Sequence, residues 1–124
     1  MKLSDEQNDF LFMLKDLLIY TEILQAKYCV KMKITELNRT IERQRKYVQD
    51  GLSQTMNSKH LLGLAVDFAP IANNKVAYES PVLDDMGAYW EAIGGTWGGK
   101  WTGFTDRPHF EYDRDKRKAY LESR

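Results

Sequence analysis

The sequence predicts an α+β domain, and three observations support this class. Apolar residues recur at helical spacing near the N-terminus, short β-prone runs occupy the middle of the chain, and helical patterns return later. Helices that gather early and late around a few short strands are typical of this class. We therefore expect a short antiparallel sheet flanked by helices. A chain of 124 residues has the length of one domain, so we expect a single domain over residues 1–124.

The first half of the chain predicts two helices around one strand. Ser4 and Gln7 form a capping-box pattern, and apolar residues follow at helical spacing to about Tyr28. Residues 29–37 switch to a period of two, which predicts a half-buried strand. Residues 40–51 have helical character, and Gly51 predicts the C-terminal cap of a helix there. Residues 52–58 are expected to form a polar loop.

The second half predicts a hairpin, a helix, a short strand and a final helix. Residues 64–72 are apolar and β-prone, and Asn73-Asn74 predicts a tight hairpin turn after them. A helix is expected to begin near Pro81. The glycine-rich residues 94–101 are expected to be irregular, residues 109–112 to form a strand, and residues 114–123 to form a helix.

Composition excludes several classes of function. Eighteen basic and 18 acidic residues cancel, and without a long basic run a nucleic-acid partner has no electrostatic support. No apolar stretch approaches the ~20 residues that span a bilayer. The acidic N-terminus does not resemble a signal peptide, so we expect a protein made in the cytoplasm. Cys29 is the single cysteine, and we expect it to be a buried, inert thiol.

Both histidines have a carboxylate nearby in the sequence. His60, Asp67 and His109 would supply three ligands to a hydrolytic zinc site, which also keeps a place for water. Asp106, across Pro108 from His109, could exchange a proton with the attacking water without binding the metal. The alternatives remain open at this point: a hydrogen-bonded structural His–Asp pair, and an aspartate that caps the turn before the proline.

Three segments resemble a known family. Residues 58–68, SKHLLGLAVDF, resemble the S-x-H-x-x-G-x-A-x-D motif of zinc D-alanyl-D-alanine carboxypeptidases and their L-alanyl-D-glutamate endopeptidase relatives. DRPHF, residues 106–110, resembles the second motif, in which an acid precedes the last zinc-binding histidine by three residues. Residues 38–51 are similar to the upstream arginine-and-glutamine segment, with Arg39, Gln44 and Gly51 in place. The ordered match covers more than half of the chain.

The resemblance implies a compact peptidase that cuts peptidoglycan stem peptides. It implies that His60, Asp67 and His109 hold Zn²⁺ and that Asp106 is the general base and acid. Arg39 would stabilise the oxyanion or hold a substrate carboxylate, since a guanidinium keeps its charge and offers several donors. Gln44 and Ser58 would contact the substrate or support the site. Trp97 or Trp101 could line a substrate cleft. The alternative for each tryptophan is that it packs in the hydrophobic core.

Two departures from the family pattern refine the expectation. Leu37-Asn38 stands where many members have a glycine nearby, which bears on the placement of Arg39. Asp106 stands where carboxypeptidases and dipeptidases carry glutamate, and the aspartate form resembles L-alanyl-D-glutamate endopeptidases found as bacteriophage endolysins. We therefore expect a monomeric zinc endolysin that hydrolyses the L-Ala–D-Glu bond after release through a holin pore. The alternatives are a D,D-carboxypeptidase or dipeptidase, and a non-catalytic wall-binding or virion module.

Overall fold

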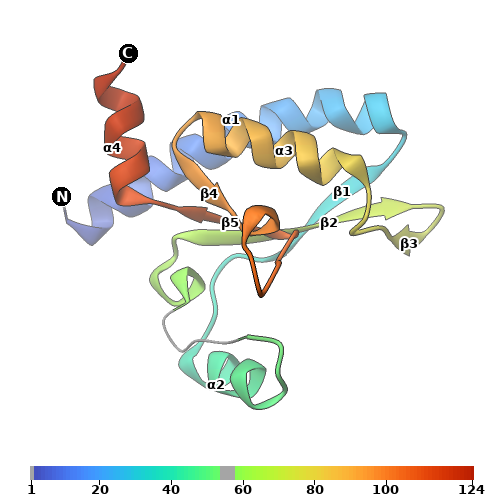
Figure 1. Cartoon of the computed structure of the whole chain (residues 1–124), viewed down its shortest axis with the longest axis horizontal. Helices are drawn as coiled ribbons and strands as arrows, with labels where there is room; N and C mark the ends of the chain where they lie inside the picture. Colours follow the sequence, from blue (N-terminus) through green and yellow to red (C-terminus); the bar gives the residue numbers. More distant parts are fainter. Residues whose placement is uncertain (1, 54–57) are drawn as a thin grey trace.

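The structure is a computed structural model that describes residues 2–53 and 58–124. Within these residues, four helices, two 3-10 turns and five strands make up an α+β fold, so the predicted class is confirmed (Figure 1). In chain order the elements are α1 (Leu3–Tyr28), β1 (Lys31–Glu36), α2 (Ile41–Gln49), η1 (Lys59–Leu62), β2 (Ala65–Ala72), β3 (Lys75–Val76), α3 (Pro81–Ala92), β4 (Gly95–Trp97), η2 (Gly98–Lys100), β5 (His109–Tyr112) and α4 (Arg114–Glu122).

The strands form one antiparallel sheet in the order β1-β2-β5-β4, and β3 pairs with the end of β2. β2 lies inside the sheet because it pairs with both β1 and β5. The predicted hairpin is confirmed: Asn73 and Asn74 have φ angles of 53° and 64°, which is the left-handed backbone of a tight hairpin turn. This arrangement puts one face of β2 at the centre of the molecule.

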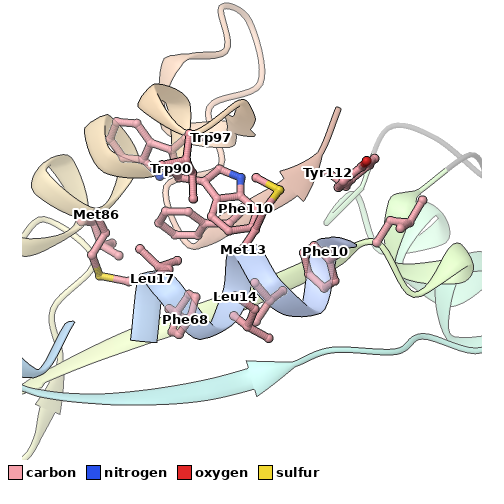
Figure 2. Packing of buried hydrophobic residues seen from close by; sticks show 14 of the residues in the cluster. Phe10, Met13, Leu14, Leu17, Phe68, Met86, Trp90, Trp97, Phe110 and Tyr112 are labelled. Carbon is pink, nitrogen blue, oxygen red and sulfur yellow. The ribbon is translucent and has the colours of Figure 1, made fainter. Parts of the chain in front are cut away.

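Helices α1 and α3 cover one face of the sheet, and α2 lies on the opposite side (Figure 1). Apolar side chains from both helices meet those of the sheet in one cluster (Figure 2). Val66 and Phe68 are fully buried in this cluster, and Phe68 and Phe110 pack edge to face. Because side chains alternate along a strand, Asp67 between them points away from the core and toward the side of α2.

Two local predictions about α1 and its end are wrong. Ser4 lies inside α1 and does not cap it; Lys2 precedes the helix, and its backbone N–H donates to Asp5 Oδ2 at 3.3 Å. Cys29 is exposed, not buried. It has a φ of 53° at the C-cap of α1, where the chain turns from the helix into β1, and this position faces solvent.

The glycine-rich segment is more regular than predicted, because it contains β4 and η2. Gly95 pairs with Tyr112, and a Cβ atom at this glycine would lie 2.1 Å from Trp90 Nε1. The missing side chain therefore lets β4 pack directly against the indole of α3. The polar loop predicted over residues 52–58 includes positions 54–57, which lie outside the described residues.

The C-terminal end of α2 follows its sequence signal, and the structure adds a cap at the N-terminal end. The Thr40 side chain accepts a hydrogen bond from the Arg43 backbone N–H, and Gly51 has a φ of 74° just beyond the helix end at Gln49. Within residues 2–53 and 58–124, no helix combines the length and the apolar character needed to cross a bilayer.

Candidate active site

The structure brings His60, Asp67 and His109 together from three elements. His60 lies on η1, Asp67 on β2, and His109 on β5 directly opposite Asp67 in the strand register. Asp67 Oδ1 lies 3.1 Å from His60 Nε2 and 3.2 Å from His109 Nδ1. One ligand atom from each residue can be chosen so that all three lie within 4.8 Å of one another.

The orientation of His60 is set by contacts behind the ring. The Ser58 hydroxyl accepts a hydrogen bond from the His60 backbone N–H at 3.2 Å, and Gly63 ends the turn with a left-handed φ of 68°. His60 Nδ1 lies 3.0 Å from the Leu37 carbonyl oxygen, which can only accept a hydrogen bond. Nδ1 therefore carries a proton, and Nε2 faces Asp67.

His109 has a second carboxylate behind it. Its Nε2 lies 2.7 Å from Glu111 Oε1, two residues later on the same face of β5. Burial alone lowers the pKa of His109, but the hydrogen bonds to Asp67 and Glu111 outweigh it and raise the pKa to about 9. Burial acts to raise the pKa of Asp67, and the hydrogen bonds from His109 and His60 hold it well below its usual range. The cluster therefore favours a positive charge between its carboxylates.

This donor set suits a zinc ion. Two imidazole nitrogens and one carboxylate oxygen are a common ligand set for catalytic zinc, and tetrahedral ligands at about 2.0–2.1 Å lie roughly 3.3 Å apart. The observed separations of 3.1 and 3.2 Å are close to that spacing. Each imidazole also has an outer partner, Leu37 O or Glu111 Oε1, as metal-binding histidines do.

A cavity of about 780 Å³ opens beside the cluster, between the sheet, α2 and the segment before β5. Its wall includes Asp67, His109 and Asp106. Asp106 is held by its backbone, since its N–H donates to the Gly98 carbonyl at 2.9 Å and its carbonyl accepts from the His109 N–H at 3.1 Å. Burial raises the pKa of Asp106 above its ordinary value, against the opposing charge of His109.

Arg39 also lines this cavity, and its guanidinium is nine-tenths buried in a network of side chains. Its Nε and Nη2 contact Glu36, and its Nη1 donates to Gln44 Oε1 at 2.6 Å and to Ser58 Oγ at 3.4 Å. Its Nη2 lies 3.7 Å from Asp67 Oδ2. Gln44 is fully buried behind Arg39, whereas Ser58 lines the cavity.

A β-bulge explains why Glu36 reaches this network. The pairing of β1 with β2 shifts between Ile34 and Glu36, so that Glu36 lies opposite Asp67. Bulges near active sites commonly redirect a side chain in this way. Sequence reasoning missed Glu36, because a bulge leaves no signal in the polarity pattern. It also missed Glu111, although an H-x-E spacing on a strand puts both side chains on one face.

The two tryptophans in question have different places. Trp101 lines the cavity, with its ring centroid 5.1 Å from that of His109. Trp97 belongs to the core: it stacks near Phe110 at 6.3 Å between centroids, and its Nε1 donates to the Arg107 carbonyl at 2.7 Å. Of the two, only Trp101 can contact a ligand in the cavity.

Comparisons with known proteins point to a class of peptidases. A family model described as "D-alanyl-D-alanine carboxypeptidase" matches residues 52–112, which contain all three metal-site residues and Asp106. The resemblance inferred from the motifs is confirmed over this segment, which is similar to that peptidase family.

Two particular relatives are similar over a larger part of the chain. An L-alanyl-D-glutamate peptidase of Listeria phage A118 is 39% identical over 87 residues, which are 68% of this chain and 31% of that protein. The crystal structure of the L-Ala D-Glu endopeptidase ChiX of Serratia marcescens superposes with a TM-score of 0.69 and 29% identity, covering 89% of this chain and 83% of that one. The chain thus spans about a third of the length of the phage relative.

Proposed function

We propose that the protein is a zinc-dependent peptidoglycan peptidase that hydrolyses the L-Ala–D-Glu bond of stem peptides. The observation that carries this proposal is the convergence of His60, Asp67 and His109 beside a cavity that Asp106 also lines. Both relatives described above are named for the L-Ala–D-Glu bond, which supports this choice of substrate.

His60, Asp67 and His109 would hold the zinc ion, with Leu37 O and Glu111 fixing the two imidazoles from behind. When bound, zinc supplies Lewis acidity that polarises a peptide carbonyl and makes water a better nucleophile near neutral pH. The cavity side of this cluster remains open for the peptide, because Asp67 and His109 both line the cavity wall. The arrangement leaves room for substrate beside three protein ligands, as catalytic zinc sites require.

Asp106 is placed to move the proton. It lines the same cavity as Asp67 and His109, and its backbone hydrogen bonds fix it relative to His109. Burial raises the pKa of its carboxyl, which improves its match to proton transfer near neutral pH. We assign to Asp106 the removal of a proton from the attacking water and its delivery to the leaving amine.

Arg39 provides fixed positive charge beside the reacting groups. Its guanidinium is buried, held on three sides, and close to Asp67. A preorganised cation in such a place stabilises negative charge that develops on the carbonyl oxygen. Gln44 supports Arg39 from behind, Ser58 contacts it from the cavity wall, and Trp101 forms part of the wall against which the peptide would lie.

The proposed biological role is that of an endolysin. The phage relative supports it, and on this proposal the protein waits in the host cytoplasm as a monomer until a holin pore gives it access to the wall. The description of the matching family favours one alternative, a D,D-carboxypeptidase that releases terminal D-alanine through the same residues.

Digestion of purified muropeptides by the zinc-loaded protein, followed by mass analysis, tests the proposal. We expect cleavage between L-Ala and D-Glu, and we expect Asp106→Asn to lower the rate by a factor of about 10²–10⁴ while zinc content is retained. Release of free D-alanine with the L-Ala–D-Glu bond intact would establish the carboxypeptidase instead. Unchanged cleavage by the Asp106 variant would remove this residue from the mechanism.

A further inference from the structure

Arg39 and Arg43 both line the cavity, and they differ in how fully protein partners already occupy their guanidinium groups. Each of the three guanidinium nitrogens of Arg39 already has a partner: Nε and Nη2 contact Glu36, and Nη1 contacts Gln44 and Ser58. A substrate carboxylate that bound Arg39 directly would have to displace these buried contacts, which leaves polar groups unpaired at considerable cost. Arg39 is therefore poorly placed to bind a second carboxylate.

Arg43 is in the opposite situation. It lies one turn into α2, its side chain is 63% exposed, and it lines the same cavity. Its ion pair with Glu36 is long, with 3.7 Å between Nε and Oε2. Glu36 is already paired closely with Arg39, so Arg43 is the cation in this network with charge left to offer.

Neighbouring groups hold Arg43 toward the cavity. Its guanidinium lies 5.9 Å from the ring centroid of Tyr47, which also stacks under Arg39 at 4.6 Å and donates to Glu36 Oε2 at 3.2 Å. A guanidinium lying against an aromatic ring loses less freedom when it binds an anion, because its position is already restricted. These contacts make Arg43 more than an unrestrained surface charge.

We propose that Arg43 is a specificity-determining residue that binds the carboxylate of the glutamyl residue following the scissile bond. This inference rests on the proposed function. A glutamyl residue whose nitrogen forms the scissile amide has two carboxyl groups, and onward linkage of the peptide uses at most one. The remaining carboxylate is the planar acceptor that a guanidinium can bind through two N–H groups.

The chemistry gives a matched pair of substrates. One peptide carries the free carboxylate on the glutamyl residue, and the other carries a carboxamide at the same carbon, so the two differ in charge and are nearly equal in shape. We expect the wild-type protein, loaded with zinc, to cleave the carboxylate peptide with a kcat/KM about tenfold higher. The preference should shrink as salt is raised, because Arg43 is exposed to solvent.

Arg43→Gln should remove this preference by lowering kcat/KM for the carboxylate peptide alone, mainly through a higher KM, because the contact exists before and during reaction. Arg43→Lys should restore part of it. Arg45→Gln is the matched control, since Arg45 is an exposed arginine of the same helix that does not line the cavity. This variant should leave kcat/KM unchanged for both peptides.

The outcomes separate this inference from the proposed function. If wild-type protein cleaves neither peptide, the proposed function is wrong. If it cleaves them and Arg43→Gln leaves the ratio of the two kcat/KM values unchanged, the function stands and the role of Arg43 is overturned. An equal loss on both peptides would also overturn it, since that result indicates a structural role.

Discussion

At the scale of single residues, the orientation of the candidate metal ligands depends on atoms behind them. Asp67 Oδ1 faces both imidazoles, and each imidazole has its own partner on the far side, the Leu37 carbonyl or Glu111. The rings therefore keep their orientation without an ion between them. Such outer contacts determine how much of the ligand orientation exists before the metal arrives.

Glu111→Gln tests this dependence. The amide keeps the size of the side chain but removes the charge that backs His109 at 2.7 Å, so zinc affinity should fall about 10- to 100-fold while the fold is preserved. Competition with a fluorescent zinc chelator measures the affinity. Glu122→Gln, an exposed change in α4, should leave it unchanged. Equal affinity of the Glu111 variant and the wild type would contradict the assignment.

Asp106 illustrates a conflict between stability and function. Its pKa is raised because burial disfavours the ionised form, so the ionised carboxyl destabilises the folded state at neutral pH. In metal-free protein, Asp106→Asn should therefore raise Tm at pH 7. The difference should shrink as pH falls and vanish below the unfolded-state pKa of about 3.9, where the wild-type carboxyl is neutral in both states. Thermal melts between pH 3 and pH 7 measure this, and a lower Tm for the variant at pH 7 would contradict it.

At the scale of elements, close backbone approach decides how α3 meets β4. A Cβ atom at Gly87 would lie 2.2 Å from the Trp97 ring, and that ring is buried against Phe110. Helix α3 and strand β4 therefore lie so close together that only glycine fits at position 87 without a clash. The position of β4 in turn sets the start of the segment that carries Trp101 and Asp106.

Gly87→Ala should destabilise the protein by about 1–3 kcal/mol through overpacking, even though alanine is the better helix former. Ala88→Ser, at the next and exposed position of α3, should stay within about 0.5 kcal/mol of the wild type. Urea unfolding curves provide both values. A Gly87→Ala protein as stable as the wild type would show that Trp97 has room to move.

At the scale of the whole molecule, the core and the site occupy opposite faces of the sheet. The buried apolar cluster lies between the sheet and helices α1 and α3 (Figures 1 and 2), whereas Asp67 and His109 line the cavity on the side of α2, with His60 buried beside Asp67. The core is therefore complete without an ion. On the proposed function, zinc binding would add stability only by favouring the folded state in which its ligands are assembled.

Chelation should accordingly abolish hydrolysis without unfolding the chain. We expect the far-ultraviolet circular dichroism spectrum to persist after zinc is removed, Tm to fall, and activity to return when zinc is added back. Parallel activity and dichroism measurements on one sample check both parts. Loss of the helical spectrum on chelation would show that the core needs the metal.

Local signals explain how much of the fold could be predicted. The Asn73-Asn74 turn, Pro81 at the start of α3 and the alternation around Asp67 all act within a few residues, and the structure contains each feature. The exposed Cys29 and strand β4 were missed because burial and pairing depend on distant partners.

The prediction of the candidate site was also limited by contacts between residues distant in the sequence. The motif residues His60, Asp67, Asp106 and His109 were recognised as a group, and the structure brings them to one cavity wall or directly behind it. Glu36 and Arg43 belong to no recognised motif. Their positions near Arg39 depend on the bulge in β1 and on where α2 lies relative to the sheet. The spacing of residues in the sequence predicts neither the bulge nor the position of α2.

The alternation in β2 has a consequence for how this protein can vary. Val66 and Phe68 point into the core while Asp67 points to the cavity, so a slip of one residue would bury the carboxylate and expose two apolar groups together. An insertion or deletion that shifts the register of this strand therefore damages the core together with the site. Within β2, the change that removes the carboxylate and spares the core is a substitution at Asp67.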